Sequence, residues 1–338
     1  MRLLFLTFFI ITFMPAETSA QNNKVQPWVV YTGGEGPGKG KHIVLISGDE
    51  EYRSEEALPM LARILATHHG FKCTVLFAID PKTGEINPEN QTNIPGLEQL
   101  QSADLMVLFT RFRELPDEQM RFIDAYTKAN KPVVAMRTAT HAFQYKKNKQ
   151  SPYAKYSYDS KVKGWEEGYG RQILGETWVD HHGDHGKEGT RGLINGLYED
   201  HPILKGVKNI WGPTDVYTIR DLSEDAQILL FGQSTHGMRD DAPLSFEKSV
   251  MPVAWTKVYK GEGGKQGRVF NTTMGASVDL ENEDLRRLLV NACYWAMGME
   301  VQIDAESQVD VVGTYNPSMF GFGDHKKGMR PSDFEVKQ

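Results

Sequence analysis

The stretch that decides the fold is His42-Ile43-Val44-Leu45-Ile46-Ser47-Gly48-Asp49. Its continuous apolar run ends in Gly-Asp, which predicts a short strand over residues 42–47 that is buried on both faces. A helix is predicted directly afterwards, over residues 54–69, because its Leu and Ile side chains share one face and Gly70 follows. Proline is tolerated only in the first turn, so Pro59 suggests that this helix can begin as late as residue 59.

The same alternation of strand and helix continues toward the C-terminus. Strands are predicted over residues 71–78, 103–110 and 132–136, and a helix over residues 116–130. Strand–helix repeats of this length favour parallel crossovers. We therefore expect an α/β fold with a doubly wound, mostly parallel sheet.

The second half of the chain is less regular. A Gly- and Lys-rich turn at residues 260–267 predicts a hairpin between the last two strands, with a closing helix over residues 282–297. The chain is thus expected to hold one domain over residues 41–300, with an extra β-hairpin and loop excursions. A flexible segment at 21–40 precedes it, and a tail at 301–338 packs over it or is partly disordered. Short strands are predicted over residues 191–194, 216–219, 228–232, 253–258 and 268–272.

Composition excludes several classes of protein. With 40% hydrophobic and 10% aromatic residues, 338 residues can bury a substantial core. The net charge of −6 gives no reason to expect a nucleic-acid or anionic-membrane partner. Cys73 and Cys293 lie in apolar segments, which predicts two buried thiols rather than a disulfide or a nucleophile.

The first twenty residues have the pattern of a signal peptide. Arg2 precedes an apolar run over residues 3–14, and Thr18-Ser19-Ala20 offers the small residues of a cleavage site. The apolar run is too short to span a bilayer comfortably, although an uncleaved anchor is the alternative. We expect an exported protein, periplasmic or secreted, whose mature chain begins near Gln21.

Polar residues follow the strand predicted at 132–136. In doubly wound sheets the ligand crevice lies at strand ends near the topological switch point, where a tight turn can expose a side chain. Arg137, Thr138 and Thr140 are therefore candidate substrate-binding residues, and His141 a candidate for proton exchange near neutral pH. The alternative is that Thr140 and His141 only cap a helix.

Two other strand ends are expected to adjoin this one. Asp49, Tyr52 and Arg53 follow the first strand and are candidate substrate-binding residues. The alternative for the acids at residues 49–51 is that they only balance nearby arginines. His236 follows the strand predicted at 228–232 and is expected to reach the same face. Trp178 is either a stacking platform for a sugar ring or ordinary core.

The densest chemistry lies in the loop Trp178-Val179-Asp180-His181-His182-Gly183-Asp184-His185-Gly186. Its glycines indicate a loop rather than a helix, which excludes the helical metalloprotease motif. Three interpretations remain open. His181, His182 and His185 can bind a divalent metal with help from a carboxylate, act directly as acids, bases or hydrogen-bond donors, or belong to a structural loop.

Four stretches, taken in their order, resemble a known family, the ThuA-like (trehalose utilisation) proteins, over about residues 40–300. The resemblance implies a flavodoxin-like fold similar to class I glutamine amidotransferases, in which a Gly-x-Cys-x-Gly elbow follows the corresponding strand. Here Arg137 takes the place of the nucleophile, which argues against glutamine hydrolysis. The resemblance also implies a carbohydrate substrate, particularly trehalose or an oxidised (3-keto) disaccharide. The four stretches are residues 46–49, 132–143, 201–203 and 270–275.

The leading hypothesis is an exported enzyme of carbohydrate catabolism that acts on a sugar or 3-keto-glycoside by proton transfer, giving isomerisation, elimination or hydrolysis. His141 and one of the loop histidines would be its acid and base, while Arg137 and Arg53 would position the substrate. One alternative is a non-catalytic sugar-binding or accessory protein. Another is a metal-dependent hydrolase using His181, His182 and His185. A small carbohydrate is the expected partner, and a divalent metal at the His-rich loop is the possible cofactor.

Overall fold

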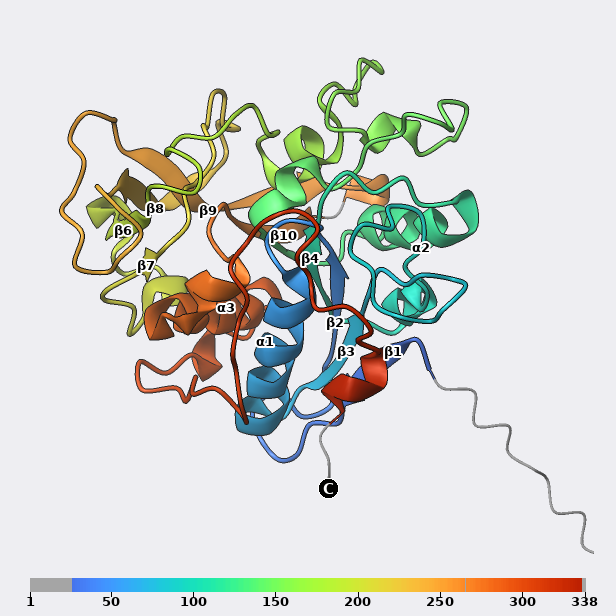
Figure 1. Ribbon diagram of the computed structural model, residues 1–338, viewed down its shortest axis with the longest axis horizontal. Helices are drawn as coiled ribbons and strands as arrows, with labels where there is room; N and C mark the ends of the chain where they lie inside the picture. The colour runs from blue at the N-terminus through green and yellow to red at the C-terminus, as the bar shows by residue number, and fades with distance from the viewer. Residues whose placement is uncertain (1–25, 265, 336–338) are drawn as a thin grey trace, which may run out of the picture.

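The computed structural model describes residues 26–264 and 266–335, so the signal peptide predicted at residues 1–20 lies outside the described residues. The chain forms one ten-stranded sheet in the order β1-β3-β2-β4-β5-β10-β9-β8-β6-β7 (Figure 1). This order confirms the expected α/β class, and it divides the sheet into a parallel half and an antiparallel half.

The parallel half follows the predicted alternation closely. Strands β3, β2, β4, β5 and β10 are neighbours in that order, and each adjacent pair is parallel. Every residue of β2, β4 and β5 is buried, as expected for strands that are covered on both faces. The bounds are β2 His42–Gly48, β3 Lys72–Leu76, β4 Leu105–Thr110, β5 Val133–Met136 and β10 Gln266–Thr272.

Helices cover both faces of this half. Helix α1 (Ser54–His69) and helix α3 (Glu283–Ala296) belong to one hydrophobic cluster, whereas α2 (Asp117–Lys128) and the short helix η1 (Leu97–Gln101) belong to the other. Helix α1 ends where the sequence predicts, with Gly70 at φ 78. The expectation that it begins as late as residue 59 is wrong, because its first helical residue is Ser54 and Pro59 lies inside it.

The antiparallel half extends from β10. The predicted hairpin joins β9 to β10, and β8, β6 and β7 continue the sheet in antiparallel pairs. The expectation of a mostly parallel sheet therefore holds for one half only. No strand forms over the predicted residues 216–219; Tyr217 makes a single bridge to His181 instead. The bounds are β6 Thr190–Ile194, β7 Trp211–Gly212, β8 Gln227–Ser234 and β9 Met251–Lys260.

Both flanking segments pack on the domain. Strand β1 (Trp28–Tyr31), within the segment expected to be flexible, pairs antiparallel with β3. The C-terminal tail rises along α1, turns near the start of that helix and returns to the short helix η10 (Pro331–Phe334), as the dark red trace in Figure 1 shows. The Tyr31 hydroxyl donates to the carbonyl oxygen of Phe334 at 2.7 Å. Of the two expectations for the tail, packing is the one observed in its described part.

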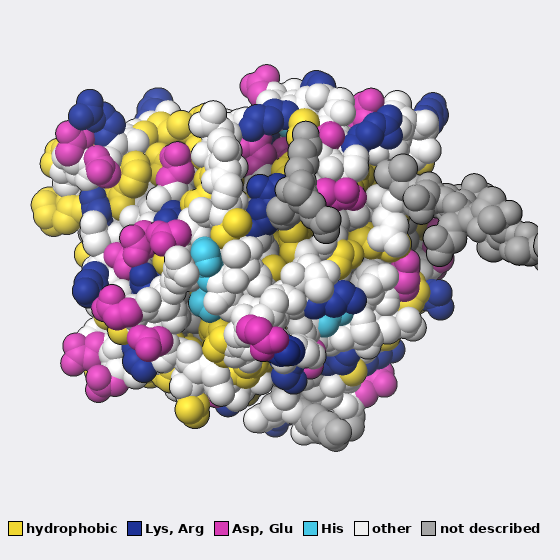
Figure 2. All heavy atoms as spheres, turned by 90° about the horizontal axis from the view of Figure 1, so that it is seen from below, with side chains coloured by type: hydrophobic (Ala, Val, Ile, Leu, Met, Phe, Trp, Pro, Cys, Tyr) yellow, Lys and Arg dark blue, Asp and Glu magenta, His cyan; other side chains and the backbone are white. Residues whose placement is uncertain are grey.

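The two cysteines are free and buried, as predicted, and burial raises the pKa of the Cys293 thiol to about 12. No helix within the described ranges has the length and apolar character needed to cross a membrane. Figure 2 shows acidic and basic side chains interspersed over one face of the molecule, with no broad field of one sign on its described part.

Candidate functional site

Asp49 joins the ends of two parallel strands. It follows β2, is fully buried, and accepts hydrogen bonds from the backbone N–H of Glu51 at 2.7 Å and of Tyr52. It also accepts the hydroxyl hydrogen of Thr138, in the short helix η2 (Arg137–His141) that follows β5. Asp49 and Thr138, both expected to bind substrate, therefore hold the loop after β2 against the turn after β5.

Arg137 makes the sharp turn that the sequence suggested. Its φ of 49° places a non-glycine residue in the left-handed region immediately after β5. Its side chain is nevertheless fully buried rather than exposed. The guanidinium donates to the carbonyl oxygens of Asp215 and Thr273 and lies 3.9 Å from the ring centre of Tyr52.

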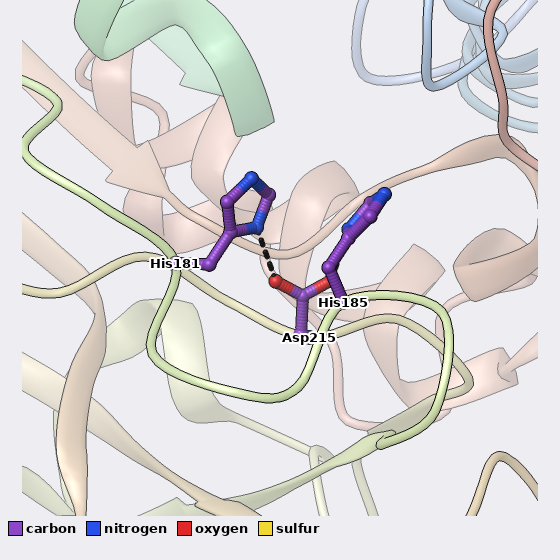
Figure 3. A group of neighbouring side chains, drawn as sticks. All are labelled: His181, His185 and Asp215. Atoms are coloured by element: carbon purple, nitrogen blue, oxygen red, sulfur yellow. Dashed lines mark hydrogen bonds and ion pairs between the residues drawn. The ribbon is translucent and has the colours of Figure 1, made fainter.

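Asp215 gathers two histidines of the His-rich loop (Figure 3). The Nδ1 atom of His181 lies 2.5 Å from one carboxylate oxygen, and Nδ1 of His185 lies 3.0 Å from the other. Arg137 approaches the same carboxylate from the protein interior at 3.7 Å. The Asp215 side chain is fully buried, whereas the side chains of His181 and His185 are 28% and 37% exposed. One interior carboxylate thus orients two imidazoles toward solvent.

The charges of this cluster depend on one another. Burial by itself raises the pKa of Asp215, but hydrogen bonds from His181 and His185 and the charge of Arg137 hold that pKa well below its usual value. The hydrogen bond to Asp215 raises the pKa of His185, and the charges of Asp215 and Glu51 act in the same direction. Asp215 is therefore ionised across the neutral range, and His185 is held toward its protonated form.

Glu51 completes the cluster on the side of β2. Its carboxylate lies 3.3 Å from Nε2 of His185 and 3.4 Å from Nε of Arg111. Burial and the neighbouring charge of Asp49 raise the pKa of Glu51. His185 therefore lies between two carboxylates, one on each ring nitrogen.

His181 keeps one ring nitrogen for other partners. Because Nδ1 bonds to Asp215, Nε2 points away from the carboxylate, as Figure 3 shows. An imidazole whose Nδ1–H is held by a buried carboxylate is the usual way to orient a general base. Trp178 stands beside this ring, with the two ring centres 6.4 Å apart. Trp178 is itself only partly buried, so it combines a core contact with an exposed edge.

His141 lies deeper than expected. Its ring is 2% exposed and packs among aromatic rings, 4.9 Å from Phe112, 5.2 Å from Trp178 and 5.5 Å from Tyr217. Burial holds its pKa well below 6.5, and the nearby positive charges of Arg111 and Arg137 add to the effect. A buried neutral imidazole is poorly placed to exchange protons with a substrate, so the expected acid–base role does not suit His141. Thr140 is buried beside it, 3.3 Å from its Nδ1.

None of the remaining candidates bonds to the carboxylate of Asp215. The Nε2 atom of His182 lies 2.7 Å from the carbonyl oxygen of Ser249, so this ring turns toward another loop. His236 is exposed, and its backbone pairs with Pro243. Tyr52 and Arg53 are both fully buried and cannot meet a substrate at the surface.

The possible metal ligands are therefore corrected. His181, His185 and Asp215, rather than the three loop histidines, place one ligand atom each within 4.8 Å of one another. Two imidazoles and a carboxylate suit a divalent transition metal. His182 is excluded because its ring is directed away from this group.

Sequence reasoning missed Asp215 altogether and treated Glu51 only as a counter-ion for nearby arginines. Asp215 stands in an irregular segment and carries no motif, and it meets His181 across 34 positions of sequence. The sequence indicates that the stretch around Glu51 follows a strand, but no local pattern distinguishes Glu51 from Glu50. The carboxylate of Glu50 pairs with Arg111 and Arg113.

The fold and this cluster define an α/β protein with a titratable site at the carboxyl edge of its parallel strands. A family model described as trehalose utilisation (ThuA) matches residues 42–296, and the chain belongs to this family, which confirms the resemblance seen in the sequence.

Comparison with curated proteins gives no match. Among solved structures, a ThuA-like protein from Bacteroides uniformis is 13% identical, with 79% of this chain and 95% of that chain covered and a TM-score of 0.49. A ThuA-like protein from Parabacteroides merdae is 14% identical, with 88% and 100% covered and a TM-score of 0.48.

Replacing Asp215 with Asn should lower the pKa of His185, because the hydrogen bond and the negative charge that raise it are lost. The pKa is measured by NMR titration of the imidazole. A raised folded-state pKa contributes stability that is present below the ordinary histidine pKa of 6.5 and is lost as the pH rises through the folded-state pKa. The loss of stability relative to wild type should therefore be larger below the folded-state pKa of His185 than above it.

Asp184→Asn is the matched control, because Asp184 lies in the same loop but its carboxylate pairs with Lys248. If the pKa of His185 is the same in Asp215→Asn as in Asp184→Asn, the proposed coupling between His185 and Asp215 is wrong.

Proposed function

We propose that this protein is a carbohydrate-utilisation enzyme that moves protons on a sugar or 3-keto-glycoside. Membership of the trehalose-utilisation family supports the substrate class. The observation that carries the proposal is the buried carboxylate of Asp215, which orients the two partly exposed imidazoles of His181 and His185. In this assignment His181 is the base, and His141, which the sequence suggested as one member of the acid–base pair, transfers no proton.

The roles follow from the charges. A carbonyl group makes the hydrogen on the neighbouring carbon acidic, so a base at Nε2 of His181 can remove that proton. The bonding pair then moves toward the carbonyl oxygen. His185, held toward its protonated form, supplies positive charge for the oxygen that becomes negative. Return of the proton to a different atom gives isomerisation, and loss of a neighbouring substituent gives elimination.

The strand order supports a ligand at this place. We propose that the parallel half is a doubly wound sheet of the flavodoxin type, because β3-β2-β4-β5-β10 repeats that order. Its switch point would then fall between β2 and β4. Glu51 follows β2 and Arg111 follows β4, and the two side chains meet there at 3.4 Å.

A metal-dependent reaction is the second candidate, because the ligand atoms of His181, His185 and Asp215 lie within 4.8 Å. A bound divalent ion would supply Lewis-acid polarisation of a substrate oxygen. The direct hydrogen bonds from both imidazoles to Asp215 favour the first candidate, since they satisfy the same atoms without an ion. A non-catalytic sugar-binding protein would show calorimetric binding of disaccharides without product.

Replacing His181 or His185 with Asn should lower the turnover of a 3-keto-glycoside panel by about 100-fold or more, the usual loss when a general acid or base is removed. Turnover is measured by product formation, with folding checked by circular dichroism. His182→Asn is the matched control, since its ring bonds to Ser249 and should leave turnover unchanged. Equal activity in all three variants would reject the proposed roles.

Metal analysis separates the two candidates. Protein purified without a His tag should hold far less than one divalent ion per chain, and a chelator should leave turnover unchanged, because hydrogen bonds already satisfy the cluster. A stoichiometric ion that is lost in both His181→Asn and His185→Asn, but kept in His182→Asn, would establish the metal-dependent candidate instead.

We also propose that the chain is exported, on the pattern of residues 1–20. Full-length protein expressed in a bacterium should appear outside the cytoplasm with Gln21 near its new N-terminus, as read by mass spectrometry. Recovery of a chain that retains residues 1–20 in the cytoplasm or membrane would contradict export with cleavage.

A further inference from the structure

The C-terminal tail reaches the candidate site although it lies beyond residue 296, where the family match ends. Ser318 donates from its backbone N–H and its hydroxyl to the carboxylate of Glu56 at 2.7 and 2.9 Å. Gly321 donates its backbone N–H to the carbonyl oxygen of Glu51 at 2.8 Å. The tail is therefore fixed to the start of α1 and to the loop after β2, on the two sides of Phe320.

The ring of Phe320 lies between the buried part of the site and His185. It stacks on the ring of Tyr52, with the two ring centres 5.5 Å apart and the planes inclined by 28°. Tyr52 is fully buried, and the guanidinium carbon of Arg137 lies 3.9 Å from its ring centre. The ring centre of Phe320 also lies 4.9 Å from that of His185, at an inclination of 56°. Phe320 therefore rests on an immobile partner and contacts the imidazole from there.

His185 needs such a contact because its polar contacts are open to water. Its side chain is 37% exposed, with Nδ1 at 3.0 Å from Asp215 and Nε2 at 3.3 Å from Glu51. Ion pairs that water can reach contribute little by themselves, since water competes for the same atoms. Two further rings contact the imidazole within the described part of the chain. His181, at 4.6 Å, is itself partly exposed, and Tyr52 meets it edge-on at 6.2 Å.

We infer that Phe320 is a positioning residue: the tail places its ring against His185 and so holds the imidazole in one orientation between the carboxylates of Asp215 and Glu51. A group that acts in a reaction must be kept within a narrow range of angles, and packing against its ring is the physical means. The inference rests on the proposed function for its effect on turnover. Its effect on His185 is independent of any substrate and can be measured separately.

The first test is the pKa of His185 in Phe320→Ala, measured by NMR titration of the imidazole. The hydrogen bond to Asp215 is the largest influence on this pKa and raises it, as does the charge of Glu51, whereas burial and the charge of Arg137 lower it. If the ring of Phe320 only covered the imidazole, its removal would let water solvate the cation and the pKa would rise. If the ring positions the imidazole, the hydrogen bond to Asp215 loosens and the pKa falls toward the ordinary histidine value. We expect a fall.

The second test is the turnover of a 3-keto-glycoside by the full chain. In Phe320→Ala, kcat should fall by about tenfold with KM nearly unchanged, because the variant disturbs the orientation of His185 and removes no contact to the substrate. The alkaline limb of the pH profile of kcat should move to lower pH, since His185 acts in its protonated form. Phe320→Tyr keeps the aromatic ring and should restore kcat, the pH profile and the pKa of His185.

Met319→Ala is the matched control, because Met319 precedes Phe320 in the same anchored segment and is 52% exposed. It should leave both the pKa of His185 and kcat unchanged. Phe320→Leu keeps an apolar side chain in the tail and should shift the pKa in the same direction by a smaller amount. It supplies the measurement if the alanine variant is not folded.

An unchanged or raised pKa of His185 in Phe320→Ala and Phe320→Leu would overturn the inference. So would a wild-type kcat in Phe320→Ala when His185→Asn has lost its turnover. A failure of the proposed function looks different: both His181→Asn and His185→Asn keep their turnover, while Phe320→Ala still lowers the pKa of His185.

Discussion

The buried carboxylate of Asp215 is the interaction on which the rest of the site depends. It receives the charge of Arg137 from the interior and the two imidazoles of His181 and His185 from the surface. A buried charge is tolerated only when it is paired, and removing one partner of such a pair costs on the order of 3–5 kcal/mol. Each of these groups therefore constrains the others, and Arg137 does so from a left-handed backbone conformation at the end of β5.

The sheet brings these groups within reach of one another. Parallel strands direct all their carboxyl ends to one edge, so the loops after β2, β4 and β5 supply Glu51, Arg111 and Arg137 at neighbouring positions. The antiparallel half adds the loop with His181 and His185, together with the segment that carries Asp215. The site is thus built from segments of both halves of the sheet.

The tail adds a feature that the family match does not cover. It packs on α1 and contributes Phe320 beside His185, so the surroundings of the cluster depend on residues after 296. Such a segment can differ between relatives without disturbing the sheet, because it crosses the surface and is held by a few hydrogen bonds to Glu51 and Glu56.

The sequence by itself determined the parallel half of the sheet, the bounds of α1 and α3 to within a few residues, and the concentration of chemistry in the loop at 178–186. Hydrophobic periodicity and Gly or Pro signals are local, so they can be read without knowing the fold. Only the tertiary structure decided which histidines work together. His182 lies between His181 and His185 in the chain yet turns away from both, and Asp215, which unites the other two, arrives from 34 and 30 positions along the chain. Such contacts depend on the path that the chain takes between strands, and no local sequence pattern predicts that path.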